Sequence, residues 1–256
     1  MGIVGVGNVG SKIASAAKAL GMKVMLNDHP RERAENTNIF SSLADILREA
    51  DIISFHVPLN KEGMDKTLGM AGKPFFSNLK KPVILINTSR GPVVNGSELK
   101  KAINRGIIKA CVLDVWEHEP EIDLELLKKV NFGTPHIAGY STDGKANGTA
   151  MSVKAISRFF NLGLDEWHPA GIPAPTDNMI ECHCPGKSEL DIIREIYLRT
   201  YNISDDDGRL RSHPGNFEFL RGNYPVRREP PAYQVKLFHC HHENLPGKLK
   251  KLGFKL

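Results

Sequence analysis

The sequence predicts a doubly wound α/β domain with a parallel sheet, followed by a small α+β domain. Three observations lead to this fold class. Residues 1–10 form a short apolar run that enters a glycine-rich turn. Apolar runs that suit buried strands then alternate with segments of helical periodicity through the first half of the chain. Residues 167–175 contain three prolines and a glycine, which is typical of a domain boundary.

The glycine-rich turn has the spacing G-x-G-x-x-G, with Gly5, Gly7 and Gly10. Gly5 would allow a tight strand-to-helix turn, Gly7 the approach of a pyrophosphate, and Gly10 close packing of the helix on the strand. The N–H groups at the start of that helix would face the anion. An ordinary strand-to-helix turn is the alternative, since the pattern alone is weak. The following segment supports the first interpretation because it keeps helical spacing and ends at Gly21.

Asp28 follows the second predicted strand, residues 23–27, at eighteen positions after Gly10. A carboxylate there accepts hydrogen bonds from the adenosine ribose and repels a 2′-phosphate, so we expect NAD rather than NADP. Arg31 is the one nearby residue that favours NADP. Together with the turn, Asp28 predicts a Rossmann domain that binds a dinucleotide.

Further elements continue the alternation. Helices are expected at residues 41–50, 97–105 and 145–161, and strands at 51–57, 83–87, 107–113 and a short run ending at Phe132. Ligands of a parallel sheet sit beyond the carboxyl ends of its strands. Residues 88–91, Asp114 and residues 134–139 follow such ends, so we expect their polar groups to converge on one rim.

We divide the chain into three parts: a nucleotide-binding domain at 1–163 that includes the helix near 145–161, a proline-rich linker at 164–178, and a C-terminal domain at 179–256. In the last part, strands are expected at 179–184 and 232–239. A helix at 188–201 is expected to bury one face, formed by Leu190, Ile193, Ile196 and Tyr197. Charged residues between the helix and the last strand are interpreted as a polar, alternately charged surface: Asp205, Asp206, Asp207, Arg209, Arg211, Arg221, Arg227 and Arg228.

Composition narrows the class of protein. The chain has 256 residues, 41% of them apolar, which suffices for real cores, and its net charge of +5 is too mild and too dispersed to favour nucleic acid. No run reaches the length of a membrane span, and no charged-then-apolar leader precedes the first strand. Four scattered cysteines suit reduced thiols, so we expect a cytoplasmic protein.

Two clusters raise the question of a metal. Cys182-His183-Cys184 and His239-Cys240-His241-His242 contain zinc-ligand types. Neither has the gap of a structural zinc knuckle, so we expect no metal site, and the role of both clusters stays open. Cys111, within a predicted strand, is interpreted as a small core residue.

Arg90, Glu119 and His136 form a coherent catalytic set. Arginine offers a bidentate fork for a carboxylate, and histidine exchanges a proton near neutral pH. A carboxylate behind the imidazole would fix its tautomer. This set suits oxidation of a 2-hydroxy acid, in which Arg90 holds the carboxylate and His136 takes the hydroxyl proton. Glu117 is an alternative for this carboxylate, but we favour Glu119 because it lies immediately before Pro120.

The chain resembles the D-isomer-specific 2-hydroxyacid dehydrogenases. The resemblance rests on the glycine turn, on Asn87-Thr88-Ser89-Arg90-Gly91, and on residues 113–120 and 134–137. A finer match at residues 136–146 and 210–229 is to a branch with a C-terminal dimerisation domain. The resemblance implies NAD as cofactor, a small phosphorylated 2-hydroxy acid as substrate, and a homodimer held by the C-terminal domain.

It also implies roles residue by residue. Arg90, Glu119 and His136 would be catalytic, and Arg90 and Tyr140 would contact substrate. Val57 stands where the wider family commonly has threonine, so a hydroxyl contact would be lost there. The NAD site implied by the motifs comprises Gly5, Gly7, Asn8, Val9, Gly10, Asp28, Val57, Thr88, Ser89, Arg90, Asp114 and Gly139.

The family has a further lobe before the glycine turn, which this sequence does not include. Either the sequence is an N-terminal truncation or the protein is a remnant without full activity. Two rival functions therefore stay open beside the leading one: another D-2-hydroxyacid dehydrogenase, such as one acting on 3-phosphoglycerate, and a non-catalytic NAD-binding dimer.

Overall fold

The computed structural model describes residues 1–256 and contains two compact units. The first unit comprises Met1–His136 and Ile203–Gly222, and the second comprises Ile137–Asn202 and Asn223–Leu256. The predicted domains are consecutive along the chain. In the structure the first unit is discontinuous in sequence, because it also includes residues 203–222. The division into domains that fold separately stays a prediction.

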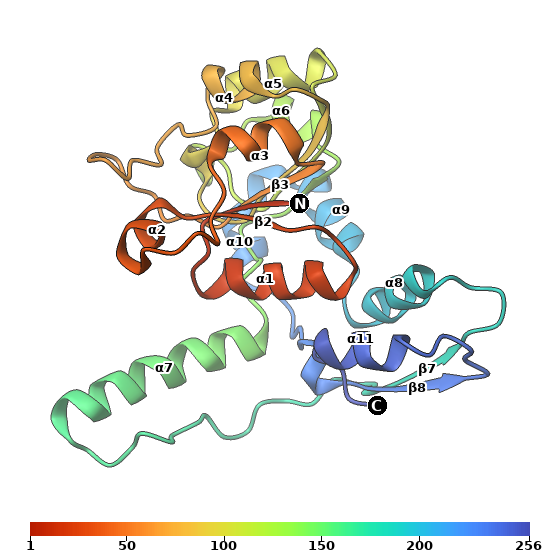
Figure 1. The fold of residues 1–256 in the computed structure, drawn as a ribbon. Helices are drawn as coiled ribbons and strands as arrows, with labels where there is room; N and C mark the ends of the chain where they lie inside the picture. Colours follow the sequence, from red (N-terminus) through yellow and green to blue (C-terminus); the bar gives the residue numbers. More distant parts are fainter. The chain divides into compact units, whose positions relative to one another are not determined.

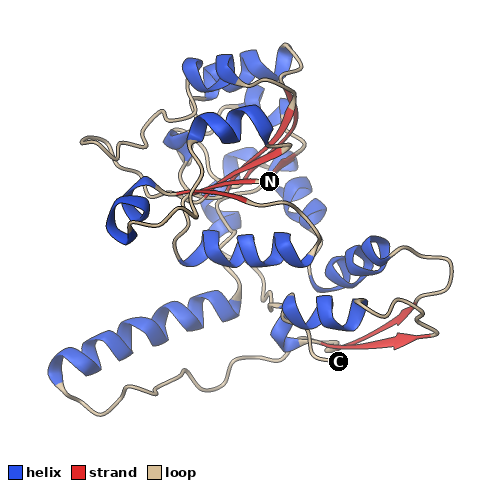
Figure 2. Ribbon diagram, viewed as in Figure 1, coloured by secondary structure: helices blue, strands red, loops and turns tan.

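The first unit is built on an all-parallel sheet, whose strands are drawn in red in Figure 2. The sheet has six strands in the order β2-β1-β3-β4-β5-β6. The strands are β1 (Gly2–Val4), β2 (Met25–Asn27), β3 (Ile52–Phe55), β4 (Val83–Asn87), β5 (Ile108–Leu113) and β6 (Phe132–Gly133). The chain passes from β1 to β2 on one side and then to β3 on the other, so the topological switch point lies between β1 and β3. The predicted doubly wound parallel sheet is confirmed.

Helices cover both faces of this sheet, with α1 on the opposite side from α3, α4 and α5 (Figure 1). The helices of the first unit are α1 (Asn8–Ala19), α2 (His29–Glu35), α3 (Leu43–Glu49), α4 (Lys73–Asn78), α5 (Gly96–Asn104), α6 (Leu124–Lys129), α9 (Ile203–Ser212) and α10 (Phe217–Gly222). Side chains of Ser42, Asn95 and Asp123 accept hydrogen bonds from first-turn N–H groups, which is why α3, α5 and α6 begin where they do.

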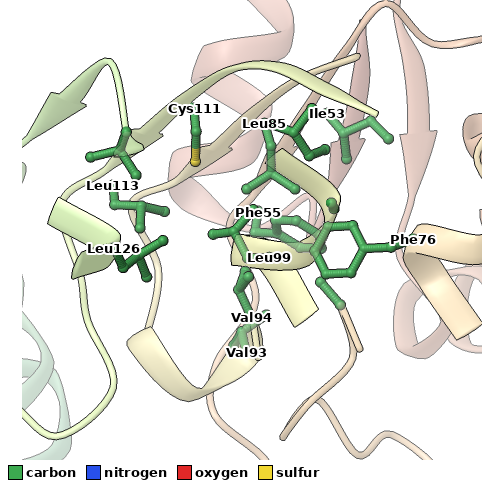
Figure 3. Packing of buried hydrophobic residues seen from close by; sticks show 14 of the residues in the cluster. Ile53, Phe55, Phe76, Leu85, Val93, Val94, Leu99, Cys111, Leu113 and Leu126 are labelled. Atoms are coloured by element: carbon green, nitrogen blue, oxygen red, sulfur yellow. The ribbon is translucent and has the colours of Figure 1, made fainter. Parts of the chain in front are cut away.

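The core of the first unit lies between the sheet and the helices on one face (Figure 3). Leu85 on β4 and Phe55 on β3 are fully buried and pack toward Leu99 of α5. Cys111 on β5 is buried in the same cluster, and burial raises the pKa of its thiol to about 12. The interpretation of Cys111 as a core residue is confirmed.

The interpretation of the charged residues between 205 and 228 as a polar surface is wrong in part, since Asp206 among them is 2% exposed. This segment contains α9 and α10, and their residues Leu210 and Phe217 are 0% and 1% exposed within the core of the first unit. Some of the charged residues also make contacts within the unit: Asp206 is buried, and Asp207 and Arg211 hydrogen-bond to backbone groups of β6 and α6. The many charged residues of this segment therefore give it a polar pattern from which its two partly buried helices are not predicted.

The second unit contains a long helix and a two-stranded parallel sheet. Its elements are α7 (Thr142–Phe160), β7 (Met179–His183), α8 (Glu189–Thr200), β8 (Gln234–Phe238) and α11 (Leu245–Lys251). On α8, Ile192, Ile193 and Ile196 are buried, whereas Leu190 is 62% exposed, so placing Leu190 on the buried face is wrong. None of the helices in the chain is both long and apolar enough to cross a membrane.

Candidate cofactor and acid–base site

The glycine-rich turn between β1 and α1 is packed tightly at two of its three glycines. Gly5 has φ +90°, and a Cβ on it would lie 2.7 Å from the carbonyl oxygen of His56. A Cβ on Gly10 would lie 2.0 Å from the carbonyl oxygen of Gly5. At Gly7 a Cβ would meet no atom within 4 Å. Gly5 and Gly10 are therefore needed by the fold itself, whereas Gly7 leaves open space in front of α1.

The start of α1 has no side-chain cap. Asn8 and Val9 are exposed at this end, and the first N–H groups of a helix have no partner within the helix. The open space at Gly7 therefore lies beside backbone donors with a favourable helix dipole. This arrangement fits a pyrophosphate.

A cavity of about 230 Å³ lies beside the turn, at the switch point of the sheet. Its walls come from the turn, from the start of α2 and from the segment after β3. Four predicted cofactor residues line it: Gly5, Gly7, Asp28 and Val57. The lining is mostly apolar, which suits a flat adenine ring. Val57 contributes to this apolar wall, and no hydroxyl is needed for that.

Asp28 joins the glycine turn to α2. Its Oδ2 accepts a hydrogen bond from the N–H of Val6 at 2.8 Å, and its Oδ1 caps α2 by accepting from the N–H of Arg31 at 3.1 Å. A carboxylate has further lone pairs, so Asp28 can still accept from a ribose. The guanidinium of Arg31 donates to Glu35 and to the carbonyl of Val6. Arg31 is therefore engaged within the protein, which weakens its attraction for a 2′-phosphate.

His56 lies in the wall of the same cavity, directly after β3. Its Nε2 is 2.9 Å from Oγ of Ser54. Burial lowers the pKa of His56 to about 4, because the charged ring would lose water without gaining a carboxylate. The imidazole is therefore neutral at physiological pH and acts as part of the apolar wall.

The loop that carries Arg90 is held by hydrogen bonds to the side chain of Asn87, which is buried at the end of β4. Asn87 Oδ1 accepts from the N–H and the hydroxyl of Ser89, at 3.0 and 2.8 Å, and its amide donates to the carbonyl of Arg90. Gly91 must be glycine, since a Cβ there would lie 1.8 Å from the carbonyl oxygen of Trp116. The loop backbone is thus rigid, while the Arg90 side chain is exposed.

Glu119 and His136 are in direct contact. The Nδ1–H of His136 donates to Oε2 of Glu119 at 2.7 Å, and Oε1 of Glu119 accepts from the N–H of Trp116, also at 2.7 Å. Because an ionised carboxylate only accepts, this bond assigns the proton of a neutral imidazole to Nδ1. Nε2 then carries the lone pair that can accept a proton from a bound hydroxyl.

Glu117 has a different role. Its Oε2 accepts from the N–H of Gly96 at 2.7 Å, at the first residue of α5. The carboxylate that orients His136 is therefore Glu119, as the position before Pro120 predicts.

The segment between β5 and His136 forms a buried network. Thr134 donates from its hydroxyl to Oδ1 of Asp114 at 2.7 Å, and the N–H of His136 donates to the carbonyl of Asp114 at 2.7 Å. The indole N–H of Trp116 donates to the carbonyl of Thr134 at 2.9 Å. Sequence reasoning gave no role to Asn87, Trp116 or Thr134, although all three lie within the motifs. They support the backbone that carries Arg90 and His136.

Gly139 and Tyr140 belong to the second unit. The Tyr140 ring packs edge-on against Tyr224, and Nζ of Lys145 lies 4.3 Å from the centre of the Tyr140 ring. Arg227 donates to the carbonyls of Ile137 and Ala138, which fixes the backbone just before Gly139. These contacts leave the predicted roles of Gly139 and Tyr140 untested.

The cysteine and histidine clusters of the second unit do not assemble into a metal-ligand set, and the chain has no group of three His, Cys, Asp or Glu side chains arranged for one. Cys182 and Cys184 are buried, and burial raises the pKa of Cys184 to about 12. His183 stacks on Phe238. A role for either cluster is not assigned.

Comparison with known proteins gives the family. Residues 1–138 match the profile described as "D-isomer specific 2-hydroxyacid dehydrogenase, NAD binding domain". The chain belongs to this family. Its first 138 residues are therefore an NAD-binding domain of the oxidoreductase type. Residues 174–253 match a domain of unknown function, DUF3410.

Curated relatives cover nearly the whole chain. It is 51% identical to a Bacteroides fragilis protein named erythronate-4-phosphate dehydrogenase. The aligned 235 residues are 92% of this chain and 65% of that protein. It is 42% identical to the Escherichia coli protein of the same name, over 99% of this chain and 67% of that one. The chain thus spans about two thirds of the length of these relatives.

Among solved structures, one that resembles the chain is D-lactate dehydrogenase from Aquifex aeolicus complexed with NAD and lactic acid. The TM-score is 0.52 at 32% identity, over 68% of this chain and 57% of that one.

Proposed function

We propose that the protein oxidises 4-phospho-D-erythronate to 3-hydroxy-2-oxo-4-phosphobutanoate with NAD, in the synthesis of pyridoxal 5′-phosphate. The relatives' names support this substrate. The observation that carries the reaction type is the 2.7 Å hydrogen bond from His136 Nδ1 to Glu119. It presents a histidine whose Nε2 can accept a proton, in a domain that binds NAD.

The proposed residue roles follow from this geometry. Arg90, exposed on a rigid loop, binds the substrate carboxylate through its guanidinium fork. His136 accepts the hydroxyl proton at Nε2, and the ionised Glu119 stabilises the resulting imidazolium. The O–H and C2–H bonds break as the ketone forms. NAD, when bound, supplies the acceptor for the C2 hydride.

The NAD contacts of individual residues are also proposed. The N–H groups at Asn8, Val9 and Gly10 would face the pyrophosphate. Asp28 would accept from the adenosine ribose, and Val57 would line the adenine pocket. Thr88, Ser89, Asp114 and Gly139 complete the set on resemblance to the family. Tyr140 is proposed as a substrate contact on the same basis.

We also propose that the protein is a cytoplasmic homodimer held by residues 179–256. Leu190 and Val226 of this region expose most of their apolar side chains, at 62% and 63%. A second copy would remove such surface from water. Sedimentation velocity of the whole chain at several concentrations tests this proposal: a dimer is expected, and a monomer at all concentrations contradicts it.

The enzymatic proposal is tested with the product of the complete coding sequence. NADH formation should be fastest with 4-phospho-D-erythronate and slower with D-3-phosphoglycerate and D-lactate. Preference for D-3-phosphoglycerate would favour another dehydrogenase of the family. NAD binding without oxidation of any of the three would indicate a non-catalytic NAD-binding protein.

A further inference from the structure

Helix α9 carries three consecutive aspartates that differ sharply in their surroundings. Asp205 is exposed, Asp206 is buried, and Asp207 reaches the sheet of the first unit. Oδ1 of Asp207 accepts a hydrogen bond from the N–H of Gly133 on β6 at 2.7 Å. The two residues are 74 positions apart in sequence. Asp207 therefore contacts the strand from which the chain continues to His136.

The Gly133 N–H needs this acceptor because β6 is the edge strand of the sheet. The next N–H, on Thr134, donates to Leu113 of β5, so the N–H of Gly133 points away from β5. Gly133 is buried, and a Cβ on it would lie 2.6 Å from Leu127 and 2.9 Å from Trp116. Asp207 is the acceptor that satisfies this buried residue's N–H, and its removal takes that hydrogen bond away.

Asp207 is itself held in place. Its Oδ2 accepts from Nε of Arg211 at 2.8 Å. The two terminal nitrogens of Arg211 donate to the carbonyls of Leu127 and Val130, at 2.6 and 2.9 Å, at the C-terminal end of α6. A cation at that position also interacts favourably with the helix dipole. Arg211 thus fixes the carboxylate between α6 and β6.

The contact lies close to the acid–base site. Only Thr134 and Pro135 separate Gly133 from His136, and proline limits the freedom of the connection. The bond that Trp116 donates to Thr134, and the bonds that Asp114 accepts from Thr134 and His136, hold this segment from the side of β5. Asp207 holds its opposite edge. Leu210 and Phe217 already supply the apolar docking of α9 and α10, so packing alone does not require a charged pair here.

We propose that Asp207, fixed by Arg211, is a positioning residue for His136. It sets the outer edge of β6 and thereby the place of the imidazole against Glu119 and the substrate hydroxyl. This inference rests on the proposed acid–base role of His136. It gives the C-terminal part of the chain a share in the chemistry of the nucleotide-binding unit, although Asp207 touches neither substrate nor cofactor.

The experiment compares Asp207→Ala, Asp207→Asn and Arg211→Lys with Asp205→Ala as the matched control on the same helix. Asparagine keeps an oxygen that can accept from Gly133, and lysine keeps the charge of Arg211 but not its fork. Two readouts are used: kcat and the KM for NAD, and the ¹⁵N NMR signals of the Gly133 amide and the His136 ring, which need no turnover.

We expect Asp207→Ala to lower kcat by about 10- to 100-fold, as displaced catalytic groups do, with the KM for NAD changed less than about twofold. The His136 ring signals should shift, and Gly133 exchange should quicken. Asp207→Asn should restore only part of kcat, because its Oδ1 can accept from Gly133 but its amide NH2 cannot accept from Nε of Arg211. Asp205→Ala should match the wild type. If Asp207→Ala does not fold, Arg211→Lys decides, with a loss of kcat and shifted His136 signals expected.

Wild-type kcat and unshifted His136 signals in folded Asp207→Ala or Arg211→Lys would overturn the proposal. An equal loss in Asp205→Ala would also overturn it. If the wild type itself oxidises no substrate, the proposed function fails, while the His136 signals still decide whether Asp207 positions the ring.

Discussion

Acidification below pH 6.5 should destabilise the first unit through His56. The ring lies in the wall of the cofactor cavity, where burial lowers its pKa to about 4, whereas the unfolded chain has the ordinary value of 6.5. The unfolded state therefore binds the proton more tightly. The contribution of neutral His56 to stability is fully present above pH 6.5 and is lost as pH falls to 4.

The size of this effect follows from the two pKa values. The gap between 6.5 and about 4 corresponds to at most about 3.5 kcal/mol of unfolding free energy, at roughly 1.4 kcal/mol per pH unit. Aspartates that accept hydrogen bonds, such as Asp45 and Asp143, have pKa values lowered below 3.8, so most of their loss comes at lower pH. His56 should therefore dominate the interval between 4 and 6.5.

The assay is urea unfolding at several pH values in this interval for the wild type and for His56→Gln. Glutamine places an amide near the position of Nε2, beside Ser54, and does not titrate. The wild type should lose about 2–3 kcal/mol more than the variant across the interval. Parallel curves for the two proteins would refute the reasoning about His56.

Three further predictions concern the cofactor site and the core. Gly10→Ala should destabilise the fold because its Cβ would lie 2.0 Å from the Gly5 carbonyl, whereas Gly7→Ala should keep the stability and weaken NAD binding. Thermal unfolding measures the stability and calorimetric titration measures NAD binding, and equal effects of the two variants would contradict the roles given to these glycines. Asp28→Asn keeps an acceptor that can cap α2 but removes the charge, so the affinity for NADP relative to that for NAD should rise by about tenfold. Titration of both cofactors measures this ratio, and an unchanged ratio would count against the assignment. Phe217→Ala should cost about 3–5 kcal/mol in guanidinium unfolding, as for a core phenylalanine, and a loss below about 1 kcal/mol would show that α10 is not part of the core.

The sheet could be predicted because its strands are short, apolar and bounded by turn residues. The prediction for residues 83–87 matches β4 in full, and its alternating burial follows the period of a strand. Helices α4 and α6 were missed because six residues carry too little periodicity. The prediction does not place α9 and α10 in the first unit, because their burial depends on contacts with elements that are distant in sequence.

The site was predictable where its residues lie within a motif. The spacing around Pro120 favoured Glu119 over Glu117, and the contact with His136 agrees. The support of the site was less visible. Trp116 acts through its backbone and indole N–H groups, and Asp207 acts across 74 positions of sequence, so no local pattern indicates either contact.

The acid–base role of His136 is tested most directly by the rate of hydride transfer in His136→Asn. NADH formation from 4-phospho-D-erythronate is measured at saturating NAD, with NAD affinity determined separately for both proteins. We predict a rate about 10²- to 10⁴-fold below that of the wild type, as loss of a general base costs, with NAD affinity nearly unchanged because the imidazole does not hold the adenosine half. A rate within about tenfold of the wild type would contradict the role given to His136 and to its bond with Glu119.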